Sequence, residues 1–138
     1  MQDTPQLIHS MLHHLSAVFG RESDQILQEQ LGIGLSQFKI LNTLVENSAM
    51  QQRHIAVQLG QTEASISRQI KLLQAKDMVE TMRNPVNRRE HITTLTPRGE
   101  RVTDAAQNVL KNFQTSALEE MPEKQQTQLL ALLARIHD

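Results

Sequence analysis

Apolar residues recur every three or four positions over most of the chain, which is the spacing of helices with one buried face. The first such run covers about residues 5–30, where Thr4 is expected to cap the helix and Pro5 to occupy its first turn. Gly20 falls inside this run and is expected to bend the helix without ending it. The two glycines around Ile33 then break the pattern.

Two shorter helices are predicted to follow this break. Ser36 can cap the second helix, whose end is expected at Asn47. The third helix is predicted over residues 52–59. Gly60 comes directly after it, at the position where a left-handed residue is preferred.

The fourth predicted helix begins at Thr62, which can cap it, and runs to about residue 76. Its apolar positions, Ile66, Ile70 and Leu73, are spaced i, i+4 and i+7 and therefore share one buried face. The opposite face is small at the helix start and basic further along. It carries Ala64, Arg68, Lys71 and Ala75, with Ser65, Ser67 and Leu72 on its flanks.

After the fourth helix the apolar period changes from helical to alternating. Residues 79–83 and 90–95 are predicted to form two strands, of which the second is rich in β-branched residues. Turn-forming residues lie between them, so the segment is predicted to be a β-hairpin. Arg88 and Arg89 give that hairpin a basic tip.

Two more helices are predicted to complete the chain. The first is capped by Thr96 and the proline after it, and Pro122 opens the second. Residues 129–136 are rich in leucine and are expected to form a dimer seam. A membrane-surface helix is disfavoured, because Lys124 and Arg135 are the only Lys/Arg residues of this last helix.

The turn between the third and fourth predicted helices has the length found in a helix-turn-helix, whose second helix lies in the major groove of DNA. Arg68 can bond guanine through two hydrogen bonds, Lys71 can meet phosphate, and the hydroxyls of Thr62 and Ser65 can donate. An arginine at the hairpin tip can enter a narrow minor groove. The alternative is a solvated helix face followed by a solubilising turn.

Charge is segregated along the chain although the net charge of the 138 residues is only −1. Residues 36–101 hold ten Lys/Arg and six Asp/Glu, a balance of +4, whereas the two ends together carry −5. A basic middle between acidic ends is typical of a polyanion-binding module with separate assembly segments. Three phenylalanines are the only aromatic residues, which disfavours stacking on single strands and favours duplex.

Other function classes find little support in the sequence. The absence of cysteine excludes disulfides, thiolate metal sites and thiol switches. No apolar run could span a membrane and no signal peptide is apparent, so a cytoplasmic protein is expected. No phosphate loop, nucleophile–base set or paired acids indicate an enzyme, and no cofactor is expected. His9 and His13 share a helix face, but no carboxylate pattern completes a metal site.

Five segments form a specific combination, although no one of them is specific alone: Leu35 to Leu41, Ile55 to Gly60, Ala64 to Leu73, Asn84 to Arg89, and Leu95 to Gly99. With one long helix before them and two after, they resemble the MarR family of transcriptional regulators. The resemblance spans essentially the whole chain. In the flanks it rests on helix pattern and length.

The resemblance implies a mainly α fold with a small β-hairpin wing. Residues 1–34 would form an N-terminal dimerisation helix and linker, residues 35–99 a winged helix-turn-helix DNA-binding lobe, and residues 100–138 C-terminal dimerisation helices. It further implies a homodimer that binds a pseudo-palindromic operator in double-stranded DNA. Such regulators are usually repressors, relieved when a small anionic or phenolic effector binds between the dimer domain and the lobe.

By match to the family, Arg68 is the leading base contact and Arg89 the leading minor-groove residue. The family's wing usually has an acid two positions before that arginine, where this chain has Asn87, which can orient Arg89 by a hydrogen bond only. The glycine common after the recognition helix is Asp77 here, a poorer but possible left-handed residue. The residues expected to contact DNA are Thr62, Ala64, Ser65, Ser67, Arg68, Lys71, Asn87, Arg88 and Arg89.

Two other readings stay open at the level of sequence. Winged helices also serve as protein–protein interaction modules without DNA binding, and the near-neutral total charge supports that alternative. A ligand-binding protein that has lost DNA binding is the other. The four cations of the fourth helix and the hairpin tip argue against it.

Overall fold

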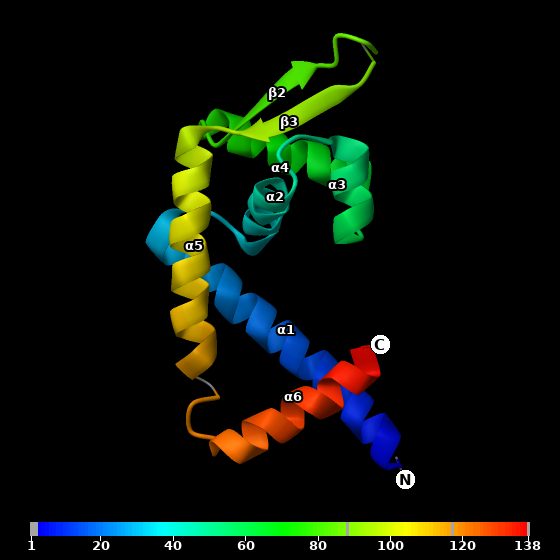
Figure 1. Ribbon diagram of the computed structural model, residues 1–138, viewed down its shortest axis with the longest axis vertical. Helices are drawn as coiled ribbons and strands as arrows, with labels where there is room; N and C mark the ends of the chain where they lie inside the picture. Colours follow the sequence, from blue (N-terminus) through cyan, green and yellow to red (C-terminus); the bar gives the residue numbers. More distant parts are fainter. Residues whose placement is uncertain (1–2, 88, 117, 138) are drawn as a thin grey trace.

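The chain folds into helices and one small sheet. The structure is a computed structural model that describes residues 3–87, 89–116 and 118–137. The elements of that part of the chain, drawn in Figure 1, are α1 (Thr4–Leu31), α2 (Leu35–Glu46), β1 (Met50–Gln51), α3 (Gln52–Leu59), α4 (Glu63–Ala75), β2 (Val79–Arg83), β3 (His91–Leu95), α5 (Pro97–Ser116) and α6 (Glu123–His137).

Helix α1 is the predicted long first helix, but its cap differs from the prediction. The side chain of Asp3 accepts a hydrogen bond from the backbone N–H of Gln6 at 3.1 Å, so Asp3 is the N-cap and Thr4 is already helical. An aspartate is as good a cap as a threonine, and it stands one residue earlier. The helix continues through Gly20 and ends at Gly32, whose φ of 67° is left-handed.

The start of α2 also corrects a prediction. Gly34 is the N-cap, so Ser36 lies inside the first turn and caps nothing. Asp24 of α1 instead accepts a hydrogen bond from the N–H of Leu35 at 2.8 Å. A carboxylate from another helix therefore satisfies a helix-start amide that would otherwise need a local cap. The end of α2 at Asn47 agrees with the prediction.

The helix-turn-helix segment folds as its sequence predicts. Helix α3 has the predicted bounds, and Gly60 closes it with a φ of 65°. The Thr62 side chain caps α4 by accepting a hydrogen bond from the N–H of Ser65 at 3.1 Å. After α4, Asp77 adopts a left-handed φ of 59°, in the place where the family resemblance expects glycine.

The sheet has one strand more than the sequence predicts. Strands β2 and β3 form the expected antiparallel hairpin, from the pair Val79 and Leu95 to the pair Arg83 and His91. The short strand β1 pairs with the other edge of β3, giving the order β1-β3-β2. Two residues are too few to show an alternating pattern, so β1 could not be predicted from the sequence.

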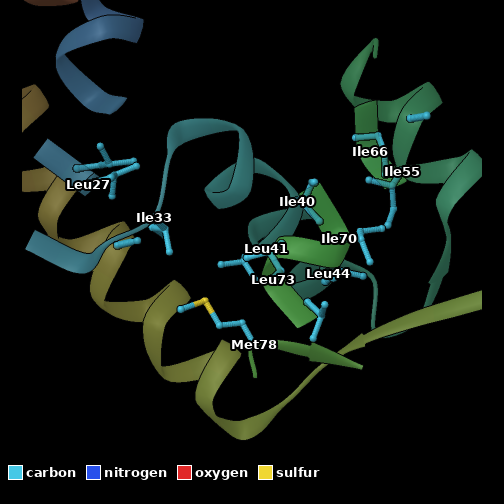
Figure 2. Packing of buried hydrophobic residues seen from close by; sticks show 14 residues of the cluster. Leu27, Ile33, Ile40, Leu41, Leu44, Ile55, Ile66, Ile70, Leu73 and Met78 are labelled. Atoms are coloured by element: carbon cyan, nitrogen blue, oxygen red, sulfur yellow. The ribbon is translucent and has the colours of Figure 1, made fainter. Parts of the chain in front are cut away.

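The core lies where α2, α3 and α4 meet the sheet and α5. Figure 2 shows side chains from α2 and α4 converging with Leu27 of α1, Ile33 of the α1–α2 connection and Met78 before β2. The inward face of α4 is the one predicted from spacing. The buried hydrophobic residues are Leu27, Ile33, Ile40, Leu41, Leu44, Ile55, Ala56, Ile66, Ile70, Leu73, Met78, Val79, Ala106 and Leu110.

A close joint connects the sheet to α5. The Thr96 hydroxyl donates to the backbone carbonyl of Asp77 at 2.6 Å and accepts from the N–H of Gly99 at 3.0 Å. A Cβ built on Gly99 would overlap the carbonyl oxygen of Met78. The first turn of α5 is therefore packed directly on the backbone between α4 and β2.

At the opposite end of the molecule, α6 crosses the N-terminal half of α1 (Figure 1). The two helices border an apolar groove of about 620 Å³, lined by Ile8, Met11, Leu12, Leu15, Leu129, Leu132, Leu133, Arg135 and Ile136. Leu132 is 58% exposed and Met11 is 64% exposed, and no residue of α6 is buried within the single chain. Among the described residues, no helix is long and apolar enough to cross a membrane.

Candidate nucleic-acid interface

Helix α4 presents a basic face to solvent because its apolar face is fully used by the core. Ile66, Ile70 and Leu73 are each at most 1% exposed. On the other side of the helix, Arg68 and Lys71 are exposed, as the spacing of the buried residues predicts. Ala64 and Ala75 are also exposed on that side.

The hydroxyl groups at the start of α4 are partly occupied within the chain. The Thr62 oxygen accepts the cap hydrogen bond, which leaves its O–H free to donate to a ligand. The Ser65 hydroxyl is within 3.3 Å of the Gln61 side-chain oxygen, to which it donates. Ser65 can therefore offer an acceptor rather than the donor expected from sequence, and Ser67 is half-buried.

The loop of the hairpin is shaped by two asparagines. The Asn84 side-chain oxygen accepts a hydrogen bond from the N–H of Val86 at 3.0 Å. The Asn87 side-chain oxygen accepts one from the N–H of Arg89 at 3.2 Å. Asn87 thus fixes the backbone of Arg89, whose side chain is exposed. Arg88, the other arginine predicted at this tip, lies outside the described residues.

A functional candidate that sequence reasoning missed is Glu90, at the base of the hairpin loop. Its Oε2 atom accepts hydrogen bonds from Gln51 Nε2 at 2.7 Å and from Asn84 Nδ2 at 3.1 Å. Gln51 is 39 residues away along the chain and reaches Glu90 because β1 pairs with β3. The one signal in the sequence is an acid directly after two arginines, which does not reveal its partner.

A hollow of about 240 Å³ separates the start of α4 from the hairpin. It brings together side chains from α3, α4 and the loop side of β3, and two of them, Arg53 and Arg89, are cations that point to solvent. The start of α4, through Glu63, and the hairpin loop, through Arg89 and Glu90, therefore border the same hollow, which Arg68 and Lys71 do not line. The lining residues are Gln51, Gln52, Arg53, Glu63, Arg89, Glu90 and His91.

The far end of α4 is tied to the junction of α1 and α2 by one lysine. Lys76 Nζ donates to the backbone carbonyl of Gly32 at 2.7 Å and to Gln37 Oε1 at 3.1 Å. Gly32 closes α1 by donating its N–H to the Gln28 carbonyl, and the helix dipole favours a cation at this end of the helix. A hollow of about 420 Å³ lies beside this contact, lined by Asp24, Gln28, Gly32, Gly34, Ser36, Gln37, Gln69, Leu72 and Lys76.

The structure places the three histidines of the first half of α1 at the surface. His9, His13 and His14 are all exposed. Within the described ranges, no three His, Asp or Glu side chains are close enough together to hold a metal ion.

Comparison with known proteins gives a family match for the middle of the chain and a likeness of fold for the whole of it. A model of the MarR family matches residues 31–90. No curated protein matches the chain by sequence, so its relationships rest on this model and on the shapes of solved structures.

Three solved structures show the likeness of fold. A mutant of MarR from E. coli superimposes with a TM-score of 0.85 at 18% identity, over 100% of this chain and 98% of that one. A MarR-family transcriptional regulator from Rhodococcus gives 0.83 at 19% identity, over 99% and 96%. The transcriptional repressor CouR gives 0.83 at 21% identity, over 97% and 94%.

The family model covers α2 to the hairpin loop, which is the segment that carries the exposed basic helix. The fold likeness extends over α1, α5 and α6 as well. The match to the MarR family model thus covers residues 31–90, and the fold of the whole chain is the winged helix-turn-helix fold of these solved structures.

Proposed function

We propose that this protein is a transcriptional regulator that binds a specific sequence in double-stranded DNA. The observation that carries the proposal is the exposed pair Arg68 and Lys71 on α4, opposite three buried residues and beside a hairpin with Arg89 at its loop. Two solved structures of similar fold support the proposal because both contain DNA. MarR from E. coli has been solved with operator DNA, and CouR with a 23-mer DNA duplex.

In this proposal α4 is the recognition helix and the hairpin is the wing. Arg68 reads a base edge in the major groove, and Lys71 contacts phosphate. The start of this helix would contact DNA through four small or hydroxyl-bearing residues: Thr62, Ala64, Ser65 and Ser67. Asn87, Arg88 and Arg89 belong to the wing, which reaches the neighbouring minor groove.

We propose that the active form is a homodimer. Residues 1–34 and 100–138 are the assembly segments, and residues 35–99 are the DNA-binding lobe. The apolar groove between α1 and α6 supports this arrangement, because leucines exposed along two helices are typical of a protein interface. Two copies would place two α4 helices about one helical turn of DNA apart, on a pseudo-palindromic site.

We propose further that the regulator is a repressor relieved by a small anionic or phenolic effector. The hollow beside Lys76 is the better of two sites between the lobe and the long helices, because a cation, Lys76, lines it together with its one acid, Asp24. The other, of about 350 Å³ between α2 and α5, is bordered by Glu100 and Asp104, which disfavour an anion. An effector that drew Lys76 away from Gly32 would loosen α4 from α1.

The competing function is a protein–protein interaction module without DNA binding. The half-exposed Leu72 on α4 and Val57, 77% exposed on α3, favour this alternative, because apolar side chains gain little from contact with phosphate. The cations of the same two helices favour DNA. The two functions differ in their response to salt, since phosphate contacts release counterions and contacts between apolar surfaces do not.

The test is a selection from a random pool of duplex DNA, repeated at two salt concentrations. We expect an inverted repeat, bound with an affinity that falls steeply as salt rises. Recovery of no common sequence, with weak binding to any duplex at low salt, would contradict the proposal. The search would then turn to protein partners that bind the exposed faces of α3 and α4.

A further inference from the structure

The wing is joined to the helix-turn-helix through one carboxylate. Glu90 lies where the hairpin loop meets β3, and its Oε2 atom receives two hydrogen bonds. Gln51, which donates one of them, is the residue directly before α3. Asn84, which donates the other, is the first residue after β2. One oxygen atom therefore binds the loop and the start of α3 together.

From Glu90 the hydrogen bonds continue through the loop to Arg89. The Glu90 carbonyl accepts from the N–H of Asn84 at 2.9 Å, and its own N–H donates to the Asn87 carbonyl at 3.0 Å. Asn84 and Asn87 then hold the amides of Val86 and Arg89 through their side chains. The exposed guanidinium of Arg89 thus extends from a backbone that Glu90 organises.

In the other direction the contacts lead to α4. The Gln51 side-chain oxygen lies 3.4 Å from an Arg53 guanidinium nitrogen, which donates to it. Gln51 also pairs with Ile92 of β3 through the backbone. Helix α3 packs in turn against α4, with Ile55 and Ile66 both fully buried. Glu90 is therefore connected both to the loop that presents Arg89 and to the base of the basic helix.

We propose that Glu90 is a positioning residue, which holds the wing in fixed orientation to α4 so that Arg89 and Arg68 engage DNA together. This inference rests on the proposed function and adds to it a residue that contributes to sequence specificity. The family resemblance places an acid two positions before Arg89, where this chain has Asn87. Here an acid on the other side of Arg89 holds the loop, through Gln51 and Asn84.

The direction of the change in DNA affinity on replacing Glu90 distinguishes a positioning role from simple electrostatic repulsion. An acid near a DNA-binding surface repels phosphate, so its removal alone should raise DNA affinity. A positioning role predicts the reverse for Glu90→Ala, which removes the acceptor of two hydrogen bonds. Glu90→Gln keeps an oxygen for both donors and removes only the charge, so it should bind as tightly as the wild type or more tightly.

The experiment measures equilibrium binding of the full chain to its selected duplex, with A·T-rich or G·C-rich flanks. We expect Glu90→Ala to weaken binding to the A·T-flanked site about tenfold and to reduce the preference between flanks. Glu90→Gln should stay within about threefold of wild type. Glu80→Ala, an exposed acid of β2, is the matched control and should not weaken binding. Unchanged or tighter binding by Glu90→Ala, with its flank preference intact, overturns the proposal.

A double-mutant cycle with Arg89→Ala tests whether Glu90 acts through that arginine. We expect Glu90→Ala to cost little further affinity once Arg89 is removed, because the contact that it positions is already lost. An equal loss in both backgrounds means that Glu90 does not act through Arg89. In that case the proposed coupling is wrong.

A measurement without DNA keeps this inference separate from the proposed function. The backbone amides of Val86 and Arg89 should become more mobile in Glu90→Ala by nuclear magnetic resonance relaxation, and should be unchanged in Glu90→Gln. Unchanged amides in both variants overturn the positioning role. If the wild type binds no duplex at all, the proposed function fails, and the relaxation data still decide whether Glu90 holds the loop.

Discussion

At the scale of single residues, Arg68 carries the sharpest prediction. It is exposed on α4 directly opposite the buried face, and a guanidinium there can form two hydrogen bonds to one guanine. We expect Arg68→Ala to weaken binding to the selected site by about 1–3 kcal/mol and to relax specificity at one base pair in each half-site. Arg21→Ala, an exposed arginine of α1, is the control. Equal effects of the two changes would mean that general charge is being measured.

Arg89 should act on the flanks of the site rather than on its centre. A narrow A·T-rich minor groove has enhanced negative potential, so the arginine gains more there than in a G·C-rich groove. We expect Arg89→Ala to weaken binding to A·T-flanked duplexes more than to G·C-flanked ones, measured by competition between the two. The same loss on both duplexes would indicate a plain phosphate contact.

Whether a residue of the DNA-binding site could be predicted from sequence depends on how far along the chain the residues that position it lie. Arg68 and Lys71 could be placed because the phase of one helix is contained in its own apolar residues. The contact between Glu90 and Gln51 could not, since it needs the pairing of β1 with β3. The contact of Lys76 with Gly32 spans 44 residues and was hidden for the same reason.

At the scale of elements, Gly99 determines how α5 meets the sheet. A methyl group at this position would overlap the carbonyl of Met78, which is backbone and cannot rotate away. We expect Gly99→Ala to lower the free energy of unfolding by about 1–3 kcal/mol, as found for overpacked sites. Chemical denaturation of the purified protein measures this change.

Gly20 provides the matched control for that substitution. A Cβ there has Leu35 Cδ2 at 4.0 Å as its nearest neighbour, which is an ordinary contact. Gly20 lies inside α1, where alanine is the better helix former, so Gly20→Ala should stabilise the protein by about 0.5–1 kcal/mol. Destabilisation by both changes would contradict the argument, because α1 would then need its glycine for another reason.

The elements themselves were predicted best where local chemistry decides them. Helices α3 and α4 have strong periodicity, a glycine end and a threonine cap, and their bounds were predicted correctly. The caps of α1 and α2 were wrong. In α2 the first amide is satisfied by Asp24 from another helix, which local sequence cannot show. In α1 two good capping residues are adjacent, and the earlier one is used.

At the scale of the whole molecule, the groove between α1 and α6 is the surface through which the proposed homodimer would form. We expect Leu132→Glu to raise the dimer dissociation constant about a hundredfold or more, because an unpaired carboxylate would be buried in the seam. Sedimentation equilibrium measures this constant. Thr127→Glu puts the same charge on α6 at a polar position outside the groove lining, and should leave the dimer intact. Dissociation by neither change would mean that the copies meet elsewhere.

The absence of any buried residue in α6 has a consequence for how the protein persists in a cell. Few contacts inside one chain keep this helix folded, so in the proposed homodimer its order would come from association. The melting temperature should then rise with protein concentration. When the number of copies in a cell falls, fewer dimers would form. The separated chains would then be more open to proteolysis, because α6 would be less ordered in them. The cellular concentration of the protein would thus determine how long it survives as well as what fraction of its DNA sites it fills. DNA occupancy would therefore change more steeply with protein synthesis than the binding curve alone predicts.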